Sequence, residues 1–185
     1  MSKLEKSGMK ALVLWVVLLL LTSVALSARS GEKESKKTAL LLARTCVAEI
    51  GFELNATVDE CELMWSINFH NALRKKRSLT RQTMLFNSYW KSKTQRRRRP
   101  WIQFLDGQTK PKYWPNSIKW SRYMDKWLQY RERALIFVLR PYDPTRICEG
   151  AMDYGARDEM PEMLGIELVK CLSIRTRQNY WRKQK

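Results

Sequence analysis

The residue with the most useful chemistry is a glutamate, Glu49, in the stretch CVAEIGF at positions 46–52. Its neighbours in that stretch are mostly apolar, and burial among them would raise the pKa of its carboxyl group. Such a carboxyl can hold a proton near neutral pH and give it to a glycosidic oxygen as the bond breaks. The structural alternative is a glutamate that only ends a helix, since Gly51 suits the position just beyond a helix end.

Other kinds of catalytic site find little support in the chain. His70 is the only histidine, and we interpret it as an ordinary helix residue. The chain has neither a C-x-x-C pair nor a G-x-x-x-x-G-K phosphate loop. We therefore expect no metal and no cofactor. Carboxylate chemistry remains, and it points to the hydrolysis of sugar chains.

The four cysteines fit an oxidising compartment, where an even number is typical of disulfides. Four cysteines allow three pairings, of which we favour the two local ones, Cys46–Cys61 and Cys148–Cys171. The first of these bonds would tie the Glu49 helix to the helix that follows it and so hold the carboxyl in place.

The N-terminal residues 1–28 have the pattern of an export signal. Three lysines precede an apolar run at 11–21 that extends loosely to 26, and a small-x-small pattern follows at 25–28. The run is short for a membrane-spanning helix. We expect a signal peptide cleaved near Ser27 or Ala28, and the alternative is an uncleaved anchor that tethers the protein through residues 11–26. Either way the protein would be exported to the periplasm, the cell envelope or the medium.

The mature chain reads as one mainly α domain, α+β at most, at 38–185 after a flexible lead-in at 29–37. We expect helices over 38–50, from Thr57 to about 74, from Ser78 to about 90, and from 116 or 117 to 139. Residues 91–100 read as a basic loop and 101–114 as an irregular segment. Beyond 142 we expect loops and short elements, because no strong strand pattern is present.

The net charge of +17 should attract anionic polymers. Anionic polymers of the bacterial envelope are one class of partner. Nucleic acid, contacted through Arg96 to Arg99 and nearby aromatic residues, is another. We expect the protein to be a monomer.

Several short motifs in order give the chain a family resemblance. Cys46-Val-Ala-Glu49-Ile-Gly51 is followed by Cys61, by Trp101-Ile102, by Trp114-Pro115 and by a helix with Trp127. Asp143-Pro144, Cys148, Gly150-Ala151, Tyr154-Gly155, Asp158, Cys171 and Asn179-Tyr180-Trp181 then close the series. This order resembles the lysozyme-like cell wall hydrolases of the lytic transglycosylase and spore-cortex-lytic type, in exported bacterial or phage versions with two cysteine pairs. The likeness covers about residues 39–181.

The resemblance implies a lysozyme-like helical domain with a groove for peptidoglycan glycan strands. It implies that Glu49 is the catalytic acid, which protonates the oxygen between N-acetylmuramic acid and N-acetylglucosamine. In a lytic transglycosylase the same carboxylate then takes a proton from the muramic 6-hydroxyl and a 1,6-anhydro ring closes. A hydrolase would use water instead, often with a second carboxylate.

The later loop supplies the remaining candidates. Asp153 is the possible second catalytic carboxylate, and Asp158 is a substrate contact or an alternative for that role. Related chains carry a histidine where this chain has Asp153, which puts the role of the loop in doubt. Tyr154, Trp101 and Trp114 are candidates for stacking on sugar rings, with packing as the alternative. A non-enzymatic exported protein that binds anionic envelope polymers or nucleic acid is the alternative function.

Overall fold

The computed structural model describes residues 31–52, 57–141, 148, 151, 153–155, 166–169, 171 and 179–183. Contacts divide the chain into two units, residues 1–37 and 38–185. The expected signal segment at 1–28 lies outside the described residues, and so does Asp158. Among the helices that are described, none combines the length and the apolar character needed to cross a membrane.

In the first unit, the described residues 31–37 are helical, where the sequence predicts a flexible lead-in. The sequence favours a helix there because oppositely charged residues stand one turn apart. Lys36 Nζ lies 2.6 Å from Glu32 Oε1, with both side chains exposed. In the second unit, residues 38–49 are helical.

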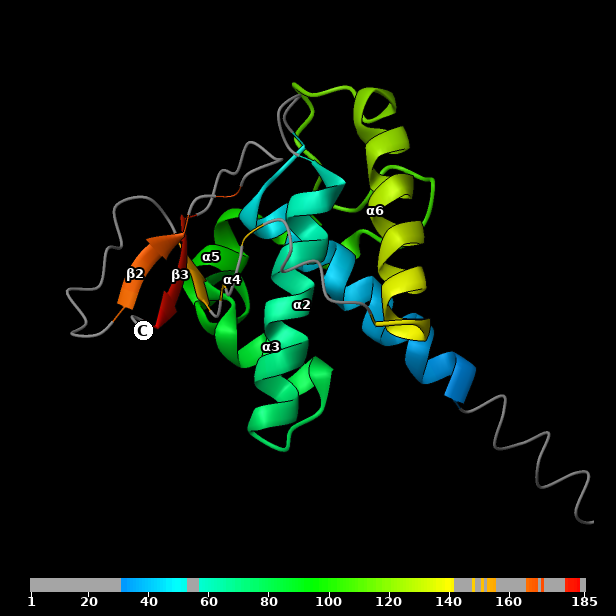
Figure 1. Cartoon of the computed structure of the whole chain (residues 1–185). Coiled ribbons are helices and arrows are strands. Elements are labelled where there is room, and N and C mark those ends of the chain that lie inside the picture. Colours follow the sequence, from blue (N-terminus) through cyan, green and yellow to red (C-terminus); the bar gives the residue numbers. More distant parts are fainter. Residues whose placement is uncertain are drawn as a thin grey trace, which may run out of the picture. The chain divides into compact units, whose positions relative to one another are not determined.

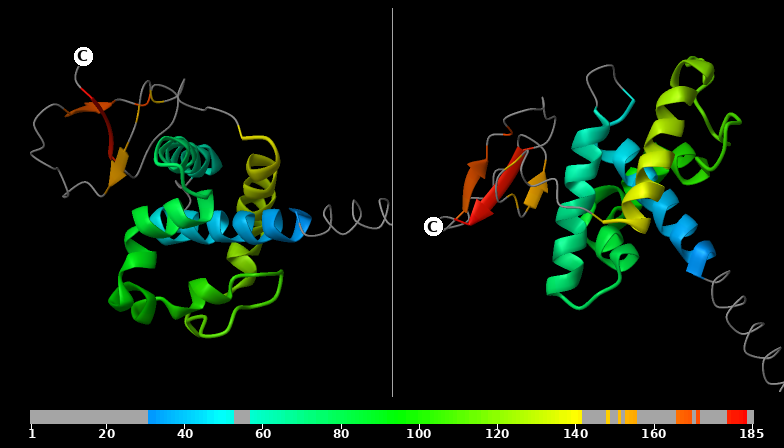
Figure 2. Two further views of the ribbon diagram at one scale, coloured as in Figure 1. Left: turned by 90° about the horizontal axis from the view of Figure 1, so that it is seen from below. Right: turned by 45° about the vertical axis from the view of Figure 1, so that its right-hand side comes forward.

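The second unit is mainly helical, as predicted (Figure 1). After the helix that ends at residue 49, its helical elements are α2 (Val58–Arg74), α3 (Leu79–Phe86), α4 (Ser88–Lys91), α5 (Lys93–Arg98), the 3-10 helix η1 (Pro100–Phe104) and α6 (Ser121–Leu139). α2 packs against both α3 and α6. In all three views α2 lies between α6 and the strands (Figures 1 and 2).

Three short strands form an antiparallel sheet near the C-terminus, where the sequence predicts only loops and short elements. They are β1 (Asp153–Gly155), β2 (Ile166–Val169) and β3 (Asn179–Lys183), in the order β1-β3-β2. Tyr154 pairs with Tyr180, and Leu168 pairs with Trp181. Strands of three to five residues carry too little alternation for a sequence pattern to reveal.

The helix starts follow side-chain capping. The Thr57 hydroxyl accepts a hydrogen bond from Glu60 N at 3.2 Å, and the Ser78 hydroxyl accepts one from Arg81 N at 3.2 Å. The sequence predicts helix starts at both residues, because a hydroxyl at the N-cap satisfies a backbone N–H that the helix leaves without a partner.

Three boundaries differ from the prediction. The helix expected from Ser78 to about Trp90 is interrupted at Asn87, which ends α3 and caps α4. The segment expected as a basic loop contains α5, capped by the Ser92 hydroxyl. α6 begins at Ser121 rather than at 116 or 117, because residues 115–120 form turns.

The core lies between the first helix, α2 and α6. Trp65 and Trp127 are the largest fully buried side chains. The indole N–H of Trp65 donates to Leu42 O at 3.0 Å, and its ring centroid lies 5.9 Å from that of Phe137. This core joins the helix that carries Glu49 to the two longest helices that follow.

Candidate active site

Glu49 is the last residue of the first helix. Ile50 N and Gly51 N donate to Cys46 O and Val47 O at 2.8 and 3.1 Å, which completes the final turn of the helix. Gly51 has a φ of 81°, in the left-handed region that glycine enters without steric cost. The prediction that Gly51 follows the helix end is confirmed, and the Glu49 side chain stands half-buried at that end.

Asn87 and Ser88, which lie at the break between α3 and α4, are neutral donors to the Glu49 carboxyl. Asn87 Nδ2 donates to Glu49 Oε1 in a short hydrogen bond. Ser88 Oγ donates to the same oxygen at 3.1 Å. Hydrogen bonds of this kind stabilise the carboxylate form and fix its orientation.

The orientation of the Asn87 amide is set by its second role. Its Oδ1 caps α4 by accepting from Tyr89 N at 3.1 Å and from Trp90 N at 3.4 Å. The side chain is 1% exposed, so it has little freedom to turn. With the amide oxygen committed to the helix N-terminus, the NH2 group must face Glu49.

Side chains from two other elements support the backbone around Glu49. Arg99 Nη1 donates to Ala48 O at 2.8 Å, and Tyr130 Oη donates to Gly51 O at 3.1 Å. A cation at this point also suits the negative end of the helix dipole. These bonds attach two parts of the chain to the end of the Glu49 helix: Arg99, just before η1, and α6, through Tyr130.

Tyr89 in turn holds Arg99. The Arg99 guanidinium lies 5.5 Å from the centroid of the Tyr89 ring, and the Tyr89 hydroxyl donates to Arg99 O at 3.0 Å. Burial raises the pKa of Tyr89, so this hydroxyl keeps its proton at neutral pH and remains a donor.

Within the basic run Arg96 to Arg99, two side chains bond to the backbone of the fold and two are exposed to solvent. Arg99 is tied to Ala48 O, and the Arg96 guanidinium donates to Trp90 O. Arg97 and Arg98 are exposed. Two of the four arginines proposed for a polymer contact thus take part in holding the fold around the Glu49 helix.

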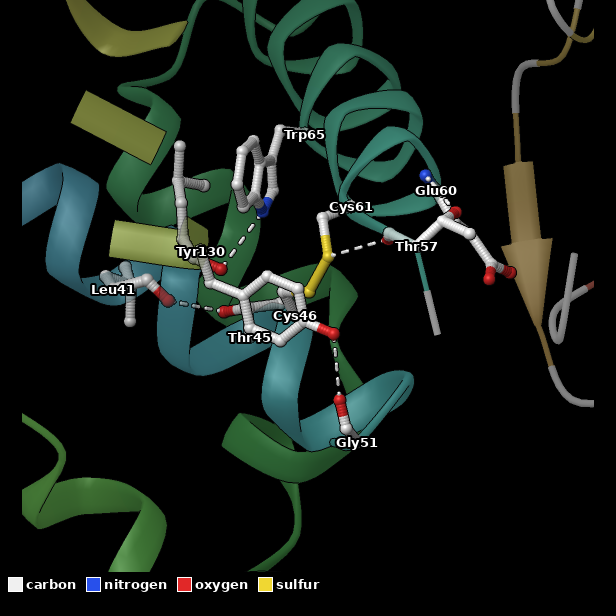
Figure 3. Close-up of a disulfide and its surroundings, with 10 residues drawn as sticks. Leu41, Thr45, Cys46, Gly51, Thr57, Glu60, Cys61, Trp65 and Tyr130 are labelled. Atoms are coloured by element: carbon white, nitrogen blue, oxygen red, sulfur yellow. Dashed lines mark hydrogen bonds between the residues drawn. A yellow bond between two sulfur atoms is a disulfide. The ribbon is translucent and has the colours of Figure 1, made fainter. Parts of the chain in front are cut away.

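Both predicted disulfides, Cys46–Cys61 and Cys148–Cys171, are present. The first lies one turn before Glu49 and joins the helix to the start of α2 (Figure 3). In the same view Tyr130 reaches the Gly51 carbonyl, and Thr57 lies next to Cys61 (Figure 3). The disulfide therefore holds the end of the Glu49 helix against the start of α2.

The predicted aromatic platforms lie in an aromatic cluster centred on Phe52. The ring centroids of Trp101 and Trp114 are 4.7 Å apart, and each lies 6.1 Å from that of Phe52. Trp114 is only 6% exposed, and its indole N–H donates to Ile118 O at 2.7 Å. These contacts support packing for Trp114, whereas Trp101 is half-buried and keeps some exposed surface.

An open hollow of about 660 Å³ adjoins this cluster at the start of α6. Tyr123 belongs to its wall, and the Tyr123 ring centroid lies 5.4 Å from that of Phe52. The other lining residues are Ser117, Ile118, Lys119, Ser121 and Arg122. Hydroxyl groups and cations in one wall suit a ligand that carries hydroxyls and carboxylates.

The two candidates from the later loop lie in β1. Tyr154 is 8% exposed, its hydroxyl accepts from Asn68 Nδ2 at 3.2 Å, and its ring centroid lies 5.4 Å from that of Phe86. Phe86 directly precedes Asn87, so β1 is brought beside the segment that holds Glu49. Asp153 pairs through its backbone with Trp181, and its side chain is outside the described part.

Sequence reasoning missed Asn87 and Ser88. The available signal was the order Asn-Ser within a helical pattern, because asparagine favours an N-cap over a helix interior. His70, interpreted from the sequence as an ordinary helix residue, is exposed on α2. The described residues contain no group of three or more His, Cys, Asp and Glu side chains suited to a metal ion.

These features define a class: a mainly helical, disulfide-bonded domain whose first helix ends on a carboxyl group held by neutral donors. Comparisons with models of protein families, with curated proteins and with solved structures give no match.

Proposed function

We propose that the protein cleaves the glycan strand of bacterial peptidoglycan between N-acetylmuramic acid and N-acetylglucosamine, with Glu49 as general acid and base. The observation that carries the proposal is the hydrogen bonding of the Glu49 carboxyl by Asn87 and Ser88 at a helix end braced by a disulfide. The order of motifs that resembles lysozyme-like cell wall hydrolases supports the same assignment.

The proposed reaction uses one carboxyl group twice. Glu49 gives its proton to the glycosidic oxygen while the bond to the muramic C1 breaks, and the other sugar leaves with a hydroxyl group. The carboxylate that remains, stabilised by Asn87 and Ser88, then removes a proton from the attacking group. That group is either the muramic 6-hydroxyl or a water molecule, and the products of the two routes differ by one water.

The surroundings of Glu49 supply the rest of the proposed site. Trp101 offers a half-buried ring for a sugar face, and the hollow at Lys119 and Arg122 suits the carboxylates of the peptide stems on peptidoglycan. Asp153 and Asp158 remain the proposed second carboxylate and substrate contact on the later loop. The disulfides fit an exported protein, which would meet this substrate.

Glu49→Gln tests the proposal in the full chain, because it keeps the size of the side chain and removes its proton chemistry. The parent should clear a suspension of purified peptidoglycan, and the variant should not, while both pellet with the polymer. Glu132→Gln is the matched control, since Glu132 is exposed on α6 and the charge change is the same. Equal clearing by the Glu49→Gln variant would reject the assignment.

A non-enzymatic binder of anionic envelope polymers or nucleic acid is the second candidate function. The net charge of +17 and the exposed Arg97 and Arg98 favour it. Such a binder should pellet with the polymer and clear it no faster than the Glu49→Gln variant does.

A further inference from the structure

The hairpin of α2 and α3 carries an unusual exposed surface that the proposed reaction does not use. Leu73, at the end of α2, is 61% exposed, and Met84 and Leu85 in α3 are 47% and 46% exposed. They are among the large apolar side chains that are exposed in the described residues. In Figure 1 the turn between α2 and α3 lies at the lower end of the helices.

Helix geometry places the apolar residues of α3 together with a cation. Arg81 precedes Met84 by three residues and Leu85 by four, so the three side chains share one face. All three are exposed, whereas Gln82 and Thr83 between them are buried. The buried pair faces inward, so the Arg81, Met84 and Leu85 face is turned to the surroundings.

Four more cations stand at the end of α2 and in the segment that leads to α3. Arg74, Lys75, Lys76 and Arg77 follow Leu73 directly, and all four are exposed. Between Glu62 and Asp106 the chain has eleven lysines and arginines and no aspartate or glutamate. Within this stretch of the sequence no carboxylate side chain offsets the positive charge.

A surface that combines large apolar side chains with several lysines and arginines suits an anionic lipid membrane best. Anionic phospholipid headgroups neutralise lysine and arginine, while the acyl boundary beneath them accepts leucine and methionine. A soluble polyanion would be held by the charges alone and would leave the apolar side chains in water. Charge complementarity with an apolar contact in the same surface thus favours a membrane surface.

We propose that the exposed α2–α3 hairpin, through Met84, Leu85 and Leu73 and the cations around them, docks on an anionic phospholipid bilayer. This contact belongs to the folded domain and is separate from any anchoring by residues 11–26. It does not depend on the proposed cleavage of peptidoglycan.

Hydroxyl-radical footprinting of the full chain tests the docking at residue resolution. The protein is mixed with vesicles of phosphatidylglycerol and phosphatidylcholine or of phosphatidylcholine alone, and side-chain oxidation is read by mass spectrometry. Oxidation of Met84, Leu85 and Leu73 should fall several-fold only with the anionic vesicles. Leu139 and Ile136 of α6, which are 63% and 45% exposed, should be oxidised equally with both and serve as matched internal references.

A charge variant and a polymer arm complete the experiment. Lys75→Gln with Arg81→Gln should weaken the protection, by about fivefold in vesicle affinity for each charge removed. Equal oxidation of Met84 and Leu85 with the two vesicle types would overturn the proposal. Protection of these residues by a soluble DNA duplex or by glycan strands as strong as that by anionic vesicles would also overturn it, and would assign the surface to that polymer.

Discussion

At the scale of single residues, Asn87 explains how a glutamate 38 positions earlier is held. Its Oδ1 caps α4 and its Nδ2 donates to Glu49. One side chain therefore both starts α4 and orients the candidate acid. Ser88, the first residue of α4, adds the second donor. The break in the helix is therefore part of the candidate site.

The variant Asn87→Asp separates these two roles. Its carboxylate can still cap α4, but it has no N–H to donate and places a second negative charge against Glu49. We expect a folded protein whose rate of peptidoglycan cleavage falls about 10- to 100-fold, the range for one hydrogen bond to a charged group. Because two carboxyls in contact resist ionising together, the pH profile of cleavage should move to higher pH.

Ser88→Ala is the comparison for Asn87→Asp. It removes one donor without adding charge, so it should lower the rate less and leave the pH profile in place. An Asn87→Asp protein that cleaves at the parent rate with an unmoved profile would contradict the positioning role of Asn87. Circular dichroism of each variant shows whether its helices are retained.

The sequence was informative about Glu49 and Gly51 because both depend on local pattern, a helix end with glycine beyond it. It was silent on Asn87, because that residue acquires its role only when the chain folds back on the first helix. The same applies to Trp114, whose burial depends on its packing with Phe52, Trp101 and Trp120.

At the scale of elements, the end of the first helix is fixed by bonds from three directions. The Cys46–Cys61 disulfide attaches it to α2, Arg99 attaches it to the α5–η1 junction, and Tyr130 attaches it to α6. Because these elements are all bonded to the end of the helix that carries Glu49, the position of the carboxyl depends on how they pack together.

Removing the first disulfide tests this arrangement. Its cysteines are 15 residues apart, and closing a loop of that length contributes about 3 kcal/mol to the free energy of unfolding. Cys46→Ser with Cys61→Ser should lower the stability measured by urea unfolding by that amount, and should slow peptidoglycan cleavage even under conditions where the variant is folded.

The double variant Cys148→Ser and Cys171→Ser is its control, because that disulfide joins segments distant in sequence from Glu49. We expect it to lower stability while slowing cleavage by the folded protein less. If the Cys46 and Cys61 variant, when folded, cleaves as fast as the parent, the disulfide does not position Glu49.

Elements marked by local caps could be predicted, and those set by distant contacts could not. The hydroxyl residues Thr57 and Ser78 made the starts of α2 and α3 predictable, because such residues favour N-cap positions. α5 was missed because a run of like charges suggests a solvated loop. In the structure, the side chains of Arg96 and Arg99 donate hydrogen bonds to the backbone carbonyls of Trp90 and Ala48. The sheet was missed because its pairing joins β1 to a strand more than twenty residues later.

At the scale of the whole molecule, the disulfides and the net charge bear on the compartment proposed for the protein. The two disulfides fit an oxidising, exported compartment, and the net charge of +17 suits an envelope rich in anionic polymers. Long-range attraction would concentrate the protein at its proposed substrate before the Glu49 site engages.

Salt dependence measures this contribution. Since exposed charges are screened by ions, binding to purified cell walls that carry anionic polymers should weaken as salt is raised. Peptidoglycan stripped of those polymers should bind with a smaller salt dependence, and the Glu49→Gln variant allows pelleting to be measured without cleavage. Binding that is equally insensitive to salt on both materials would contradict a role for the net charge.

The central claim is that Glu49 performs acid and base catalysis on a glycan strand, and mass spectrometry of the soluble muropeptides tests it most directly. The parent protein and the Glu132→Gln control should release fragments cut between N-acetylmuramic acid and N-acetylglucosamine, with anhydro or reducing muramic ends. The Glu49→Gln protein should release none above background. Release of the same fragments at the same rate by Glu49→Gln, or of none by the parent, would contradict the account.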